Sequence, residues 1–219
     1  RATRWLNEAA SAPRTLYGQL AAYQLGLDSQ LDFSPSRTTK AAFENLASSP
    51  RGARALALIQ VGRTHDAEQE LRGAWTGASE TRRRAIMAAA ERGGLASLSM
   101  HLGWREHRAT GRVVDAASYP MPGFAPRDGF AIDRALLFAI MRQESAFRPD
   151  VSSHAGARGL MQVMPRTAQA MARLNGVPGV RRATLYQPDL NMALGQDFIE
   201  HLLESPYIAD SLFHIVASY

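Results

Sequence analysis

The stretch LLFAIMRQESAFRPDVSSHAGARGLMQVMP, residues 136–165, decides how the rest of the chain is interpreted. Its first half predicts an amphipathic helix, because apolar side chains recur at three- and four-residue steps. These side chains are Ile132, Leu136, Leu137, Ile140 and Met141. Glu144 falls on the same face, and partial desolvation there raises the pKa of its carboxyl group. Such an acid suits general acid catalysis near neutral pH. A lone Glu at a helix end more often just pairs with a neighbour such as Arg142 or Arg148.

The chain leaves this helix shortly after Glu144, because Pro149 cannot continue it. The residues that follow are small or conformationally permissive, so they let the backbone approach another body closely. They are Ser152, Ser153, Gly156, Ala157 and Gly159. Gln162 then lies among apolar and thioether side chains, and Pro165 suits the first turn of another helix. Taken alone, this arrangement is also compatible with a tight connection between two helices.

The same stretch contains a gap-free series of short motifs: Glu144-Ser145-Ala146-Phe147, Pro149, Ser153, Gly156-Ala157 and GLMQVMP at 159–165. The series resembles the signature of the soluble lytic transglycosylases, bacterial enzymes that cut the glycan strands of peptidoglycan. The resemblance implies a catalytic domain with a lysozyme-like fold of the goose type. It also implies that Glu144 is the catalytic acid, and that Ser153, Gln162 and Met164 line the sugar-binding cleft.

Two further motifs extend the resemblance towards the C-terminus. Asn191 followed by Gly195 matches a third family motif, which implies that Asn191 takes part in substrate binding, although a helix N-cap and a close-packing glycine explain this pair equally well. Tyr219 lies where the family has Ala-Tyr-Asn-Ala-Gly, so the resemblance implies that it belongs to the substrate-binding residues and that its hydroxyl supports the catalytic Glu. Because the remainder of that motif is missing, we expect a catalytic domain truncated at its C-terminus, and a fragment whose own activity is in doubt.

The rest of the chain predicts a nearly all-α protein of two domains. Residues 1–117 contain short apolar stripes, many alanines and frequent helix breaks, which favour stacked helix pairs in an α-solenoid. The expected third helix begins at Pro35. A cluster of Pro and Gly precedes the second domain, residues 118–219. No strand alternation is visible, although a small hairpin is expected within residues 150–165. The last helix is expected to face inward with Ile208, Leu212, Ile215 and Val216.

Composition limits the partners that the protein can have. The chain has 219 residues, no cysteine and a formal net charge of +5, carried almost entirely by arginine. This balance favours an anionic partner, either nucleic acid or a cell wall that bears stem-peptide carboxylates. The arginines are dispersed, which disfavours nucleic acid. The six histidines lack a metal-ligand spacing, and no phosphate-binding loop is present, so neither a metal nor a cofactor is expected.

The location of the protein is inferred only through the family. The chain begins at Arg1 without a signal peptide, which suggests a processed or excised part of a longer protein. No stretch reaches the roughly 20 apolar residues of a membrane span, and anchoring to a membrane stays open. The resemblance implies secretion into the periplasm, with peptidoglycan strands as substrate. Further partners in cell-wall synthesis or the envelope machinery also stay open.

The mechanism depends on whether Glu144 has a partner. Ordinary glycosidases use two carboxylates, but Asp133 lies about three helical turns before Glu144, and Asp150 lies beyond Pro149. The resemblance implies a single acid that cleaves the bond between N-acetylmuramic acid and N-acetylglucosamine and leaves a 1,6-anhydro end. Two alternatives are a hydrolytic muramidase with a second acid, and a non-catalytic peptidoglycan-binding or scaffold module.

Overall fold

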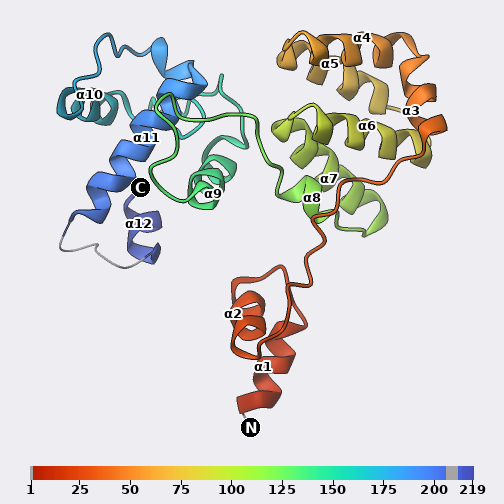
Figure 1. Cartoon of the computed structure of the whole chain (residues 1–219), viewed down its shortest axis with the longest axis horizontal. Coiled ribbons are helices and arrows are strands. Elements are labelled where there is room, and N and C mark those ends of the chain that lie inside the picture. The colour runs from red at the N-terminus through yellow and green to blue at the C-terminus, as the bar shows by residue number, and fades with distance from the viewer. Residues whose placement is uncertain (1, 206–211) are drawn as a thin grey trace.

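The computed structural model describes residues 2–205 and 212–219, and within them every regular element is helical. Figure 1 shows three parts: a pair of helices near the N-terminus, a stack from α3 to α8, and a bundle from α9 to α12. The predicted all-α class is therefore confirmed. No helix in the described part is long and apolar enough to cross a membrane.

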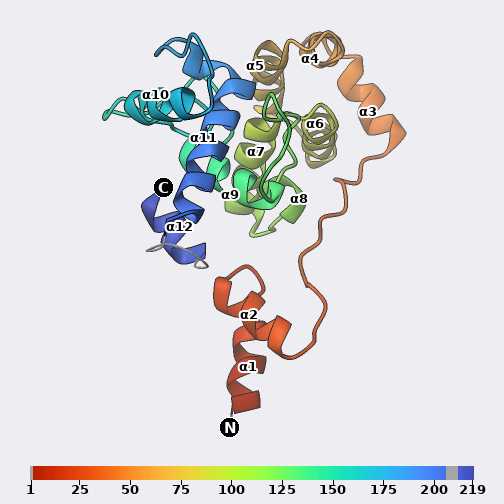
Figure 2. The same cartoon turned by 60° about the vertical axis from the view of Figure 1, so that its left-hand side comes forward.

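The N-terminal pair lies apart from the other two parts (Figures 1 and 2). Helices α1 (Ala2–Ala10) and α2 (Leu16–Gln24) pack on each other through a small core of alanines. Residues 25–39 then run without regular structure to α3 (Lys40–Ala47). The prediction of a helix from Pro35 is wrong, because Thr39 caps the helix: its backbone is extended and its hydroxyl accepts a hydrogen bond from the Ala42 N–H at 3.1 Å.

The stack is built from helices that pack against near neighbours. It comprises α3, α4 (Pro50–Gln60), α5 (Thr64–Trp75), α6 (Glu80–Arg92), α7 (Ala96–Thr110) and the short α8 (Asp115–Ser118). Helix α4 packs on α5, α6 on α7, and α3 against α6. Their shared core combines many alanines with fully buried Leu46, Leu71, Ile86 and Leu98. Small side chains let the helices approach closely, as the sequence predicted for a superhelical segment.

The bundle is organised around its longest helix. It comprises α9 (Arg134–Ser145), α10 (Pro165–Leu174), the 3-10 turn η1 (Thr184–Tyr186), α11 (Pro188–Leu203) and α12 (Leu212–Ser218). Every residue of α11 from 190 to 196 is buried, so this helix forms the centre of the core. Leu137, Met141 and Met171 pack around it from α9 and α10. Isolated antiparallel bridges join Arg158 to Ser152 and to Val163, which confirms the small hairpin.

The predicted inward face of the last helix is only partly correct. Ile215 is buried, but Val216 is 55% exposed, because α12 covers the core with one face and the next residue points away from it. Ile208 and the side chain of Leu212 lie outside the described residues. The domain boundary near residue 118 stays a prediction: Ala117 packs in the core of the stack, and Phe124 packs against that of the bundle.

A buried carboxylate joins the N-terminal pair to the stack. Asp115 is 3% exposed and accepts two hydrogen bonds from the Arg14 guanidinium, both at 2.7 Å, and one from the Asp32 N–H at 3.1 Å. The hydrogen bonds from Arg14 lower the pKa of Asp115. The stability they contribute is present above the unfolded pKa of the group and is lost as the pH falls through its folded pKa.

We predict that Asp115→Ala loosens the N-terminal pair. Hydrogen bonds to charged groups contribute about 1.5–3 kcal/mol, and the lower end applies because the Arg14 side chain is 42% exposed. Limited proteolysis should then cut residues 25–39 faster than in the wild type. Asp66→Ala is the matched control, because Asp66 forms a more exposed pair with Arg63. Equal cleavage rates in all three proteins would show that the Arg14–Asp115 ion pair does not hold the N-terminal pair of helices in place.

Candidate active site

Glu144 lies in the last turn of α9, where the helix emerges from the core. Asp133 caps the other end of the helix by accepting a hydrogen bond from the Ala135 N–H. Leu137, Ile140 and Met141 are buried, while the Glu144 side chain is exposed. Desolvation by the surrounding protein still raises the pKa of its carboxyl group. The predicted position at the edge of an apolar stripe thus produces an acid that is accessible and harder to ionise.

The turn after Glu144 has unusual backbone geometry. Ala146 and Phe147 have φ angles of 51° and 61°, in the left-handed region that L residues rarely adopt. Such geometry costs about 1–2 kcal/mol per residue. Phe147 is 3% exposed in the core of the bundle, and burying an aromatic side chain contributes roughly 1.5–3 kcal/mol. Burial of Phe147 therefore offsets the strain and stops α9 directly after its acid.

The loop beyond this turn places Gln162 beside the hairpin. Gln162 has a φ of 47°, and its side-chain amide donates to the carbonyls of Gly159 at 2.8 Å and Val151 at 3.3 Å. The Gly159 N–H donates back to the Val151 carbonyl at 3.0 Å. These bonds close the loop on itself, so Gln162 is held in one orientation at its edge.

Ser153 and Met164 both reach the surface, as a ligand-contacting role requires. The Ser153 hydroxyl accepts a hydrogen bond from the Ala157 N–H at 3.1 Å and closes the turn between them. Met164 directly precedes α10 and is 39% exposed. The structure therefore leaves these two side chains, with Glu144, open to solvent.

Asn191 has a different place from the one that the sequence predicted. It is 0% exposed, and it caps no helix, because Gln187 is the N-cap of α11. Its amide oxygen accepts from the Met161 N–H at 2.7 Å, and its NH₂ group donates to the carbonyls of Arg158 and Leu185, both at 2.9 Å. Asn191 thus holds the loop against α11, and its part in substrate binding stays a prediction.

Tyr219 also binds the backbone of Met161, the loop residue whose N–H donates to Asn191. Its hydroxyl donates to the Met161 carbonyl at 2.7 Å, so both ends of Met161 are fixed, one by α11 and one by the residue after α12. Burial raises the pKa of Tyr219, and the nearby negative charge of Glu144 raises it further. The phenol therefore stays protonated near Glu144, and its hydrogen bond holds the loop.

Gly159 and Gly195 allow the loop to pack closely against η1 and α11. A Cβ atom at Gly159, where φ is 77°, would come within 2.2 Å of the Leu185 carbonyl oxygen. A Cβ at Gly195 would come within 2.5 Å of the Met161 sulfur. Both glycines belong to motifs visible in the sequence. The roles of Phe147 and of the Met161 backbone were missed, because their sequence signal is indistinguishable from that of ordinary core residues.

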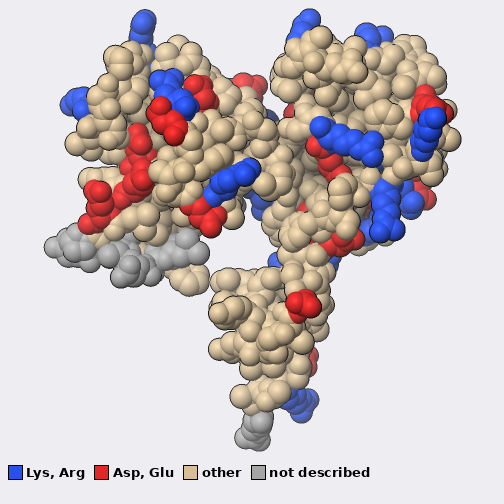
Figure 3. All heavy atoms as spheres, viewed as in Figure 1, with Lys and Arg blue, Asp and Glu red and all other residues tan. Residues whose placement is uncertain are grey.

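Among the described residues, no other carboxylate contributes to the raised pKa of Glu144. Desolvation alone accounts for the raised pKa. Asp133 is occupied as a helix cap, and Asp189 pairs with Arg127 at 3.6 Å. The described residues also contain no cluster of His, Cys, Asp or Glu that could hold a metal ion. On the face in Figure 3, basic and acidic residues are interspersed over both large parts.

Together the fold and the site define a lysozyme-like domain preceded by a superhelical segment. Residues 124–219 match the family described as the Transglycosylase SLT domain. The resemblance to soluble lytic transglycosylases, first drawn from residues 144–165, is thereby confirmed.

Curated relatives agree with this assignment. The soluble lytic murein transglycosylase of Escherichia coli K12 is 36% identical over 77 residues, which are 35% of this chain and 12% of the relative. The membrane-bound lytic murein transglycosylase C of Klebsiella pneumoniae is 33% identical over 111 residues, 50% of this chain and 28% of the relative. The aligned stretches therefore cover only a small part of these relatives, at most 28% of their length.

Solved structures match over nearly the whole chain. The 70-kDa soluble lytic transglycosylase of Escherichia coli has a TM-score of 0.71 at 23% identity, with 93% of this chain and 33% of that chain covered. An inactive mutant of lytic transglycosylase Slt from Pseudomonas aeruginosa has a TM-score of 0.68 at 24% identity, with 92% and 33% covered. These likenesses establish the fold and confirm the superhelical and lysozyme-like architecture.

We predict that Asn191→Ala destabilises the domain by about 3 kcal/mol or more, because it leaves one N–H and two carbonyl groups without partners and each costs about 1–3 kcal/mol. Urea unfolding measures the change. Asn45→Ala, on the exposed side of α3, should change the free energy of unfolding by less than about 0.5 kcal/mol. A similarly small change in the free energy of unfolding for Asn191→Ala would show that its three hydrogen bonds do not stabilise the loop.

The raised pKa of Glu144 predicts a pH-dependent stability. Between its unfolded and folded pKa values the folded protein binds more protons, so stability falls as the pH rises through this window and stays lower above it. Glu144→Gln should therefore melt at a higher temperature than the wild type at neutral pH, and at the same temperature below the window. Glu8→Gln, exposed on α1, should show no such difference. If Glu144→Gln also melted at a higher temperature than the wild type at low pH, the raised pKa of Glu144 would be contradicted.

Proposed function

We propose that the protein is a lytic transglycosylase that cleaves the bond between N-acetylmuramic acid and N-acetylglucosamine in peptidoglycan and leaves 1,6-anhydro-muramoyl ends. One observation carries the proposal: Glu144 is an accessible acid whose pKa is raised by desolvation without help from a second carboxylate. Glycosidases that activate water need such a partner, whereas attack by a hydroxyl of the substrate itself does not.

In the proposed reaction Glu144 protonates the glycosidic oxygen, and the bond to the anomeric carbon of the muramoyl residue breaks. The N-acetyl group of the substrate stabilises the positive charge that develops there. The Glu144 carboxylate then takes the proton of the muramoyl C6 hydroxyl as its oxygen attacks the anomeric carbon. Glu144 is returned to its protonated form, so one residue acts first as acid and then as base.

The remaining site residues are proposed to orient the sugars. Gln162, fixed by its own loop, together with Ser153 and Met164 at the surface, would bind the N-acetyl group and the ring. Asn191 and Tyr219 would act indirectly, because both hold Met161 next to Gln162. A displacement of about 1 Å in such a site can cost about a hundredfold in rate, so these positioning contacts bear on catalysis.

The relatives support the same substrate and place of action. They are named as murein transglycosylases, soluble or membrane-bound, and one similar solved structure is a complex of the 70-kDa soluble lytic transglycosylase with bulgecin A. We therefore propose peptidoglycan strands as the substrate and the periplasm as the location. No observation favours the hydrolytic muramidase or the non-catalytic module over this function, and the products separate all three.

The test is digestion of purified peptidoglycan followed by mass spectrometry of the products. We expect muropeptides with anhydro ends, each one water lighter than a product with a reducing end. Glu144→Gln should lower the rate by about 10²–10⁴, the usual contribution of general acid–base catalysis. The solved Pseudomonas aeruginosa mutant likewise replaces a glutamate with glutamine and is inactive.

Glu8→Gln is the matched control and should cleave at the wild-type rate. Products with reducing ends would show a muramidase instead, and binding without cleavage by the wild type would show a non-catalytic module. Cleavage by Glu144→Gln at the wild-type rate would remove this residue from the mechanism.

A further inference from the structure

An apolar cavity of about 670 Å³ lies between the helical stack and α9, and Glu144 does not line it. Its walls come from α6, α7 and α9, from residues 119–121 and from the extended segment before α3. Most of the side chains that border it are apolar, among them Phe33, Pro35, Leu95, Met121, Phe138 and Phe147. Ligand sites usually enclose about 300–1,000 Å³ and have mainly apolar walls, so the cavity has the size and lining for one small molecule.

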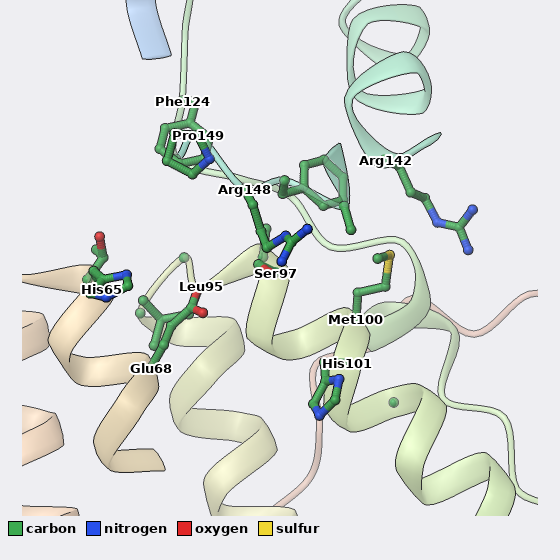
Figure 4. Close-up of a pocket in the computed structure, with 18 of the residues that line it drawn as sticks. His65, Glu68, Leu95, Ser97, Met100, His101, Phe124, Arg142, Arg148 and Pro149 are labelled. Carbon is green, nitrogen blue, oxygen red and sulfur yellow. The ribbon is translucent and has the colours of Figure 1, made fainter. Parts of the chain in front are cut away.

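Arg142 brings a positive charge to this cavity. In Figure 4, which shows the neighbouring cleft between the stack and the loop after the acid, the Arg142 guanidinium points away from Arg148. Its Nε donates to the Ser118 carbonyl at 2.9 Å, and the group lies over the Tyr119 ring, 4.8 Å from the ring centroid. These contacts hold the guanidinium against the linker, while its terminal nitrogens have no partner among the described residues. They are therefore available to a ligand.

Ser99 adds a buried hydroxyl to the wall of the cavity that α7 forms. The residue is 1% exposed, and its hydroxyl has no hydrogen-bond partner in the described part of the chain. Nearly all buried polar groups in folded proteins are paired, because leaving one unpaired costs free energy. A polar ligand atom that entered the cavity beside Ser99 would supply the missing partner.

The carboxylate that lines the cavity is already bound by the protein. Glu91 accepts hydrogen bonds from the N–H and the hydroxyl of Ser36, at 2.7 and 2.6 Å. These bonds tie the segment before α3 to α6, and they keep Phe33 and Pro35 at the border of the cavity. Arg92 lies at the same end and is exposed. Of the charged groups around the cavity, those free to bind a ligand are therefore cationic, and the matching ligand is an anion.

We propose that this cavity binds an apolar monocarboxylic acid of the fatty-acid type, with its carboxylate held by Arg142 and Ser99 and its chain between the stack and α9. A guanidinium suits this ligand because its donors match both carboxylate oxygens. A glycan does not suit the cavity, because its many hydroxyl groups would meet mostly apolar walls. The bound chain would rest on Phe147, whose burial holds the strained turn after Glu144. The ligand would therefore stabilise the folded protein without entering the site of the acid.

The test is titration of the whole chain with decanoate in a calorimeter, at concentrations too low for micelles to form. Decanoate should bind, and the melting temperature of the protein should rise with its concentration, because the ligand binds the folded state. Arg142→Gln should weaken binding about tenfold or more, because a charged hydrogen bond is lost. Ser99→Ala should weaken it by a smaller factor, because the lost hydrogen bond comes from a neutral group. Decanol and decyltrimethylammonium, which lack the negative charge, should bind the wild type as weakly as decanoate binds Arg142→Gln.

A variant that fills the cavity locates the site independently of charge. Ala139 lines the cavity from an exposed position on α9, so the indole of Ala139→Trp should occupy the space without entering the core and should abolish binding. Ala170→Trp and Arg166→Gln, both exposed on α10 and outside the cavity, are the matched controls and should bind decanoate as the wild type does.

Three results would overturn the proposal, whether or not the protein cleaves peptidoglycan. The first is absence of binding to the wild type, and the second is equal binding by Ala139→Trp or equal binding of decanoate and decanol. The third is self-association of the wild type that Ala139→Trp abolishes, because a second copy of the chain would then fill the cavity.

Discussion

The side-chain amide of Asn191 is the contact on which the site depends. It lies fully buried on the central helix of the bundle, so its oxygen and its NH₂ group must all find partners inside the protein. They find them on backbone groups of Arg158, Met161 and Leu185. Because these groups belong to the hairpin loop and to η1, one side chain draws both segments onto α11. The loop that presents Gln162 is thereby fixed relative to α9 and its acid.

The surroundings of Glu144 lower the stability of the folded protein and raise the pKa of the carboxyl group. Desolvation raises the pKa of the carboxyl group, which disfavours the ionised form in the folded protein. The backbone beyond it is strained at Ala146 and Phe147, and the burial of Phe147 in the core holds that strain in place. Strained backbone and a perturbed acid at the same helix end are typical of functional sites. Both the perturbed acid and the strained backbone lie in the bundle.

The superhelical segment is more than a support for the bundle. Helices α5 and α7 form one wall of the cleft that the loop after Glu144 closes from the other side. The Arg14 clamp on Asp115 in turn joins the N-terminal pair to α8, the last helix of the stack. The groups that face the cleft come from α5, α7 and the loop after Glu144, which are far apart in the sequence. Their charges can act together only in this packing.

The sequence by itself determined several of the helices and the place of Glu144 at the end of one of them. The apolar period before Glu144 predicted α9, Pro165 predicted the start of α10, and the spacing of residues 144–165 identified the family, because periodicity, proline geometry and short motifs are local properties of a chain. The tertiary structure alone decided what Asn191 does, where Arg142 points and which side of α12 is covered. A sequence shows that Asn191 is polar, but not that two of its partners lie 30 and 33 positions earlier in the chain. Burial and such partners follow from packing between distant segments, which no local pattern encodes.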